Sequence, residues 1–298
     1  MGGNSLLCDL AAEVRAIAKS AEMRRRRELW VRHFNCEAQA KIPVKCAMFI
    51  DTDDCIWERL IPREERTYHR GLEARLELML RQRIFKYRHI PDDDVVLPVL
   101  WLSADCSAGS PYPWGVPTPI ESPTEPLGAY RPRPAIEGEG DLSKLCYPAF
   151  SMRKESSERL VEQATALVGG QLEVKLRTDH LHYGPWEWAV RLRGMGNLLY
   201  DVVDRPQFVH RLMEHLTTGL VEYHRQREAS GAYDAESSLG LHQPYDEIPA
   251  SLQHRLSGGW VYCHAQSAAS LSPAMYAEFV HPYNVRIAEL FRRVYYHG

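Results

Sequence analysis

Hydrophobic residues recur every three to four positions at the start of the chain and in short unbroken runs further along it. Over residues 6–38 the spacing is that of an amphipathic helix. Short apolar runs, which are typical of buried strands, then alternate with further segments of helical period. The predicted strands cover residues 43–50, 95–103, 172–177, 259–264 and 294–298. The predicted helices between them cover residues 72–86, 155–168, 186–193 and 206–230.

The segment 259–298 predicts a strand, a capped helix and a second strand. Ser272 and Pro273 have the residue types of an N-cap and a first helical position. The apolar residues that follow share one helix face: Phe279, Val280, Tyr283, Ile287 and Leu290. This order predicts a β-α-β crossover with parallel strands, and α/β folds carry their chemistry at the carboxyl ends of such strands. We expect the second strand to be interrupted at Gly298, because a strand at the functional end of a sheet needs a neighbour.

Strands and helices alternate along the chain, which predicts an α/β fold and favours a barrel. We expect residues 1–42 to form an N-terminal helical extension and residues 43–298 to form the barrel domain. The arginine run 24–27 stands beside Glu22 and Glu28 and is interpreted as a solvated helix face rather than a binding patch.

Composition narrows the classes of partner. The chain has 298 residues, 45% of them hydrophobic and 25% charged, with a formal net charge of −3. This balance gives no reason to expect a nucleic acid or an anionic membrane as partner.

No apolar run approaches the roughly 20 residues of a membrane-spanning helix, and the amphipathic, acid-containing start resembles neither a secretory signal nor a transit peptide. The seven cysteines are scattered without CxxC spacing, which is typical of a reducing cytoplasm; we expect most of them to be buried core residues.

Asp105 is the first candidate for chemistry, because it follows a predicted buried strand and enters a long proline-rich loop. A carboxylate there could orient a substrate or act as a general acid or base. The alternative is an ordinary strand-end aspartate that caps the loop.

His180 and His182 form the second candidate. Two residues apart in an extended chain, they point to the same side and could share a metal or a polar ligand. Gly184-Pro185 then starts a helix whose free N–H groups could hold an anionic group. Hydrogen-bonded or solvent-facing loop histidines are the alternative reading.

The third candidate lies at the carboxyl ends of the last two predicted strands. Cys263 and His264 alternate to opposite faces and should not bind one ion together. His264 and Gln266 share a face, and His297 lies near them if the two strands are neighbours. Tyr295 shares a face with His297. A single histidine at a strand end often has only a structural role. Two alternatives therefore stay open for His264 and His297: they bind a ligand together, or they are purely structural.

Several common signatures are missing: the sequence has no Walker loop, GxGxxG, HExxH or GxSxG. Five other segments follow one another in a fixed order. They are Trp101-Leu102-Ser103-Ala104-Asp105, the pair Pro134–Glu137 and Asp141–Leu145, Gly184-Pro185-Trp186, the stretch Leu199–Met213, and Leu271-Ser272-Pro273 with Phe279-Val280-His281-Pro282-Tyr283. In this order they resemble the uroporphyrinogen decarboxylase superfamily, which includes the corrinoid-dependent methyltransferases. The resemblance covers roughly residues 43–298.

The resemblance implies a (β/α)8 TIM-type barrel with its site at the carboxyl ends of the strands, here expected to lack its last strand or two. Decarboxylases of this superfamily carry an Arg-Gln-Ala-Gly-Arg run after the first strand, which suits a substrate with many carboxylates. The corresponding residues 48–54 are acidic and contain no arginine, which argues against a porphyrinogen substrate.

The methyltransferase branch has a His-x-Cys zinc site, and His297-Gly298 matches its first two positions. Zinc in that site deprotonates a thiol that accepts a methyl group from a corrinoid. We therefore predict a cytoplasmic methyltransferase with a corrinoid protein and a small thiol-like acceptor as partners, possible homodimerisation, zinc at His297 and a substrate-orienting or acid/base Asp105. His180, His182, His264 and Gln266 are predicted to line the substrate pocket.

Two alternatives stay open: a metal-independent decarboxylase or lyase of the same superfamily that acts on a small carboxylic acid, and a non-catalytic member that binds a corrinoid or tetrapyrrole.

Overall fold

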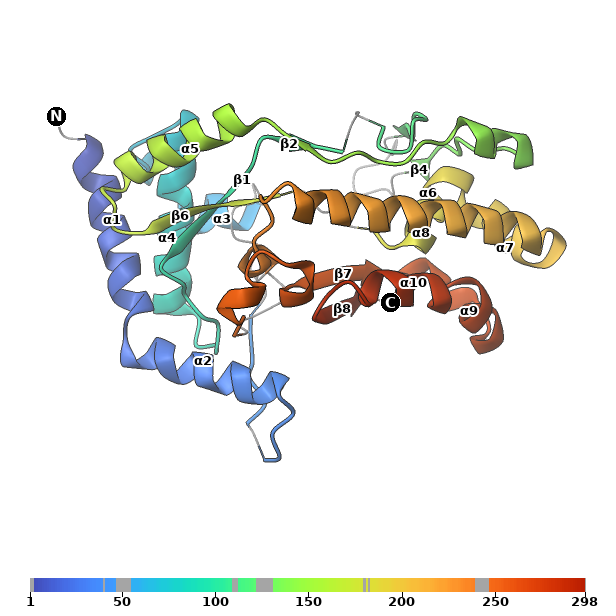
Figure 1. Cartoon of the computed structure of the whole chain (residues 1–298). Coiled ribbons are helices and arrows are strands. Elements are labelled where there is room, and N and C mark those ends of the chain that lie inside the picture. Colours follow the sequence, from blue (N-terminus) through green and yellow to red (C-terminus); the bar gives the residue numbers. More distant parts are fainter. Residues whose placement is uncertain are drawn as a thin grey trace. The chain divides into compact units, whose positions relative to one another are not determined.

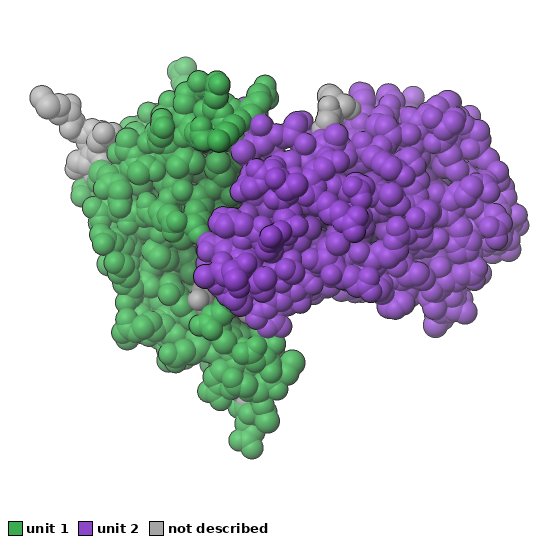
Figure 2. Space-filling view, viewed as in Figure 1, with its two compact units in different colours: residues 1–104, 153–177, 239–247 green, residues 105–152, 178–238, 248–298 purple. Residues whose placement is uncertain are grey.

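The chain is organised as two compact units (Figure 2). The computed structural model describes residues 3–39, 41–46, 55–108, 112–121, 131–178, 181, 183–238 and 247–297. Unit 1 contains residues 1–104, 153–177 and 239–247, and unit 2 contains residues 105–152, 178–238 and 248–298. Each unit has its own hydrophobic core among the described residues.

Unit 1 packs helices against one parallel strand pair (Figure 1). Its core joins Leu7, Leu80, Leu100 and Ala164, which come from three helices and a strand. The elements are α1 (Gly3–Ala18), α2 (Ala21–Phe34), α3 (Cys55–Leu60), η1 (Arg63–Glu65), α4 (Gly71–His89), β1 (Val99–Ser103), α5 (Lys154–Leu167) and β6 (Glu173–Arg177). The predicted helix over 6–38 is thus two helices, because Ser20 caps α2 by accepting a hydrogen bond from Met23 N at 3.2 Å.

Unit 2 contains the second parallel strand pair and the longest described helix, α8. Gly194, at φ 81°, lets the chain end α6 and begin α7 at one residue. The end of α6 at Arg193 is as predicted, but the helix α7 that follows was not predicted. Its helices are α6 (Pro185–Arg193), α7 (Met195–Asp204), α8 (Pro206–Ala229), α9 (Pro273–Phe279) and α10 (His281–Ala288), with 3₁₀ turns η2 (Glu139–Lys144), η3 (Ala235–Ser238), η4 (Ala250–Leu252), η5 (Leu256–Gly258) and η6 (Gln266–Ser270). Its strands are β2 (Cys106–Ser107), β3 (Ile120–Glu121), β4 (Arg131–Pro132), β5 (Ser151–Met152), β7 (Trp260–His264) and β8 (Arg293–His297).

The predicted α/β class is confirmed. Within the described ranges the strands form four two-stranded sheets: parallel β1–β6 and β7–β8, and antiparallel β2–β5 and β3–β4. A closed barrel is therefore not formed by the part of the chain that the structure describes.

The predicted crossover between β7 and β8 is confirmed, and the two strands are parallel. Ser272 caps α9 as expected, by accepting from Met275 N at 3.2 Å. The single helix predicted after it is wrong: the chain leaves helical geometry at Val280, and α10 restarts with Pro282 in its first turn. The restart keeps Phe279, Val280 and Tyr283 in the core, so the predicted apolar face survives the break.

Two strand predictions in unit 1 are wrong in their described parts. Residues 41–46 are not a strand. Residues 47–50 lie outside the described residues, as does the whole acidic run at 48–54. In the second case only Val99–Ser103 is a strand, because Pro98 has no N–H to donate to a ladder.

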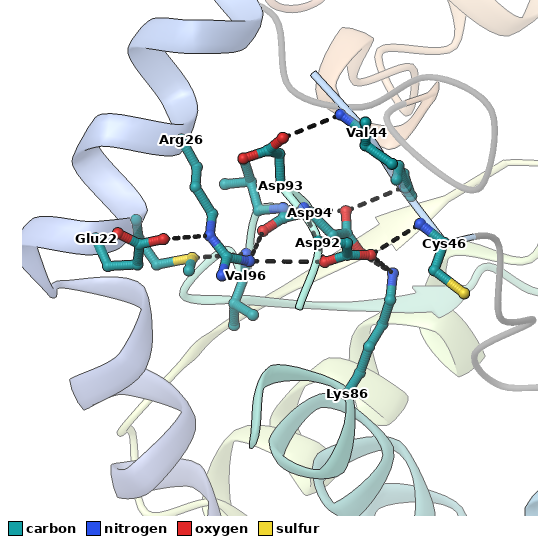
Figure 3. A network of polar contacts seen from close by, with 12 residues as sticks. Glu22, Arg26, Val44, Cys46, Lys86, Asp92, Asp93, Asp94 and Val96 are labelled. Atoms are coloured by element: carbon teal, nitrogen blue, oxygen red, sulfur yellow. Dashed lines mark hydrogen bonds and ion pairs between the residues drawn. The ribbon is translucent and has the colours of Figure 1, made fainter. Parts of the chain in front are cut away.

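In place of strand pairing, the backbone of residues 41–46 bonds to a cluster of three aspartates, Asp92, Asp93 and Asp94 (Figure 3). Val44 N donates to Asp93 Oδ2 at 3.0 Å and Cys46 N donates to Asp92 Oδ2 at 2.9 Å. Asp93 N returns a bond to Val44 O at 2.7 Å. Backbone groups that a sheet would have paired are thus satisfied by carboxylates.

Cations hold this cluster from two helices and a loop. Lys86 of α4 bonds to Asp94, and its Nζ lies 3.4 Å from Asp92 Oδ2. Lys45 Nζ lies 3.2 Å from Asp94 Oδ1. Arg26 of α2 donates to Asp94 O at 2.8 Å and lies 3.7 Å from Asp92 Oδ1. Since Arg26 is only 8% exposed, the interpretation of the arginine run as a solvated face is wrong at this position.

We expect Asp94→Asn to lower the free energy of unfolding at pH 7 by on the order of 3 kcal/mol, because it removes a carboxylate that balances the buried ammonium group of Lys86. Burial raises the pKa of Asp94, but Lys45 and Lys86 outweigh it and the pKa is lowered. The stabilisation is therefore complete above the pKa of an unfolded aspartate, about 4, and disappears as the pH falls through the lower folded-state value. Urea unfolding followed by circular dichroism from pH 7 downward measures this.

The matched control is Glu158→Gln in the same unit, whose exposed pair with Lys154 spans 3.7 Å. Its effect should be about 0.5 kcal/mol or less. A difference between Asp94→Asn and the wild type that stays constant at every pH would contradict the role given to this carboxylate.

Candidate functional site

The parallel pairing of β7 and β8 sets His264 directly opposite His297. Their ring centroids are 4.8 Å apart in a T-shaped arrangement. Val261 and Cys263, which alternate with this face, are buried in the unit 2 core. The core of unit 2 therefore covers one face of β7, and His264 lies on the other.

Aromatic rings extend the same face one step towards the strand starts. Tyr262 is the register partner of Tyr295, and their rings stack at 5.4 Å with an interplanar angle of 14°. The His297 ring lies 6.0 Å from Tyr262 and 6.3 Å from Tyr295. Burial, with smaller contributions from Tyr295, Glu187 and Tyr183, raises the pKa of Tyr262, so its phenol is a neutral hydrogen-bond donor near pH 7.

Gln266 orients His264. Its Oε1 lies 3.3 Å from His264 Nε2, and an amide oxygen can only accept a hydrogen bond. His264 Nε2 therefore carries the hydrogen, and in the neutral ring Nδ1 keeps its lone pair for a ligand or a proton. On His297 the Nδ1 atom is buried and has no hydrogen-bond partner among the described residues.

The start of α6 is held against the end of β7. A Cβ on Gly184 would lie 2.7 Å from His264 O and 3.3 Å from His264 N, so only glycine allows this approach. Glu187, one turn into α6, accepts from Ser267 N at 2.8 Å and from Ser267 Oγ at 2.6 Å. Tyr183 stacks on His264 at 6.1 Å.

The structure brings three of the predicted residues together: His264, Gln266 and His297. Their role in binding stays a prediction. His180 and His182 lie outside the described residues. Asp105 is partly exposed and stands between β1 and β2, where the chain passes from unit 1 into unit 2. It is not among the ring contacts and hydrogen bonds of His264 and His297 within the described ranges.

Cys263 lies on the covered face and is 1% exposed. Burial raises the pKa of its thiol to about 12, so it is protonated and unreactive at neutral pH. This agrees with the expectation that Cys263 and His264 do not share an ion. The broader expectation that most cysteines are buried is wrong for the described ones, of which only Cys263 is buried.

The described donors supply part of a zinc ligand set. The pair His264–His297 offers two imidazoles, and zinc in proteins takes three or four protein ligands. Among the described residues no group of three or more His, Cys, Asp or Glu side chains is arranged to hold a metal ion.

Residues on α6 and on the segment leading into it belong to the site but were not singled out from the sequence. Tyr183 stacks on His264, and Glu187 bonds to Ser267, only because α6 meets β7, which no local pattern shows. Arg191 lies over the Tyr183 ring. Tyr262 could have been found, since it shares the strand face of His264 two residues later.

Comparison with known proteins gives no relative: no family model matches the chain, and no curated protein matches it. Among the described residues no helix combines the length and the apolar character that crossing a membrane requires.

We expect Gly184→Ala to destabilise the protein by about 2 kcal/mol, because the added methyl group meets immovable backbone at His264. Gly196→Ala is the matched control: nothing lies within 4 Å of a Cβ there, and alanine is the better helix former. Urea unfolding compares the two variants. Equal stabilities would show that the start of α6 does not rest on β7.

Proposed function

We propose that the chain is a methyltransferase of the uroporphyrinogen decarboxylase type, which moves a methyl group between a corrinoid protein and a small thiol-like acceptor. The observation that supports this most is the apposition of His264 and His297 at the carboxyl ends of adjacent parallel strands. Parallel α/β folds place their chemistry at this end.

His297 would hold zinc, with His264 as its nearest imidazole neighbour at 4.8 Å between ring centroids. A zinc ion there would lower the pKa of a bound thiol and so supply a thiolate nucleophile. Gln266 fixes the ring of His264, in the manner of the outer-shell partners that orient metal ligands. The phenol of Tyr262 gives the acceptor a neutral donor, and the stacked tyrosine rings exclude water from one side of it.

The proposal also includes a barrel fold, the partners of the protein and roles for three further residues. The two parallel pairs, β1–β6 and β7–β8, are proposed to be parts of a (β/α)8 barrel in which residues 43–298 form the barrel domain. The partners would be a corrinoid protein and a small molecule, in the cytoplasm, with neither nucleic acid nor membrane involved and with a homodimer as a possible assembly. Asp105 would orient the substrate or exchange a proton with it, and His180 and His182 would line the pocket.

The test uses the natural full-length protein, methylcobalamin and a small thiol such as 2-mercaptoethanol. We expect zinc-dependent demethylation of methylcobalamin, followed by its visible absorbance, and loss of that activity in a chelator. His297→Ala removes a proposed ligand and should weaken zinc binding by more than the roughly 10- to 100-fold that loss of an outer-shell partner causes. His69→Ala, at an exposed histidine of unit 1, should leave zinc binding unchanged.

Turnover of a small carboxylic acid that is insensitive to chelators and lost in Asp105→Asn would overturn the proposal in favour of a metal-independent lyase. A bound pigment without any methyl transfer would overturn it in favour of a non-catalytic binding protein.

A further inference from the structure

Arg191 of α6 carries a charge that no described carboxylate balances. Its guanidinium lies over the Tyr183 ring at 5.7 Å and over the Trp188 ring at 5.5 Å. The Nε atom is buried and has no hydrogen-bond partner among the described residues. Arg191 is thus a cation without an ion-pair partner among the described residues, and a guanidinium of this kind can bind an anionic group.

The natural partner of Arg191 on its own helix is Glu187, four residues earlier, where ion pairs usually form. That pair is absent from the ion pairs of the described residues, because Glu187 Oε1 instead accepts two hydrogen bonds from Ser267. Glu187 thus connects α6 to the turn after β7. The guanidinium of Arg191 is left available to bind an anionic ligand.

The residues around Arg191 indicate which kind of ligand could bind there. Trp188 is 5% exposed, and its Nε1 is a second buried donor without a partner in the described part of the chain. Tyr183 is 36% exposed and also stacks on His264. A ligand beside Arg191 therefore meets a cation and the exposed part of the Tyr183 ring, and Tyr183 links this place to the histidine pair.

We propose that Arg191, Tyr183 and Trp188 form a recognition site for the carboxylate of a planar aromatic acid. A guanidinium binds a carboxylate through two parallel hydrogen bonds, and the aromatic rings offer a stacking surface. One negative charge suits the site better than two, since Glu187 lies one turn away. The inference names the substrate class of the methyltransferase site and in that sense rests on the proposed function, but binding can be measured without turnover.

Calorimetric titration with benzoate tests it, with benzamide as the neutral molecule of the same shape. We expect benzoate to bind and benzamide to bind about tenfold more weakly or worse, which corresponds to one charge-assisted hydrogen bond. Arg191→Gln should weaken benzoate binding by a similar factor, and Arg191→Lys, which keeps the charge but loses the fork, should give an intermediate value. Arg225→Gln is the matched control, since Arg225 is an exposed arginine that pairs with Glu222 at 3.0 Å.

Circular dichroism checks that the Arg191 variants remain folded, and the lysine variant keeps the test valid if the glutamine variant does not. Equal affinities for benzoate and benzamide, or benzoate binding that survives Arg191→Gln, would overturn the inference. So would binding of inorganic phosphate in preference to benzoate. Benzoate binding without methyl transfer would refute only the proposed function, and methyl transfer without benzoate binding would refute only this inference.

Discussion

The register of β7 against β8 is the constraint on which the candidate site depends. Because side chains alternate along a strand, a slip of one residue would turn His297 to the covered face and bring Tyr296 to His264. On β7 the burial of Val261 and Cys263 in the unit 2 core fixes the face that His264 takes. On β8 the hydrogen bond between the Tyr296 and Tyr276 hydroxyls, at 2.7 Å, holds Tyr296 on the face opposite to His297. Burial on β7 and this hydrogen bond on β8 together fix which side chains meet at the strand ends.

Polar contacts then fasten the neighbouring elements to this pair. Glu187 binds the turn after β7, and Gly184 allows backbone contact at His264. Unit 1 uses the same principle elsewhere: Asp92, Asp93 and Asp94 satisfy backbone N–H groups of a loop and gather cations from α2 and α4 (Figure 3). In both places a carboxylate connects two segments of the chain by accepting hydrogen bonds. In α6 the carboxylate of Glu187 therefore does not pair with Arg191.

Local patterns were sufficient for the elements whose causes are local. The cap at Ser272 and the alternation through His264 predicted the crossover, and through it the meeting of His264 with His297. The pattern failed where distant residues decided the outcome. The segment around Val44 has the apolar character of a strand, but its backbone bonds to aspartates about fifty positions away, and Arg26 is buried for the same reason. The contribution of α6 was invisible because no spacing within residues 183–191 reveals that the helix begins against β7.

The central claim is that His264 and His297 are direct neighbours across a parallel strand pair, and cysteine cross-linking tests it most directly. In a Cys263→Ala background, His264→Cys combined with His297→Cys should form a disulfide under mild oxidation, because register partners on adjacent strands lie about 5 Å apart. His264→Cys combined with Tyr296→Cys is the comparison, since those side chains point to opposite faces. A fast cross-link only in the first pair is the predicted result; no cross-link in the first pair, or an equal rate in the second, would contradict the account.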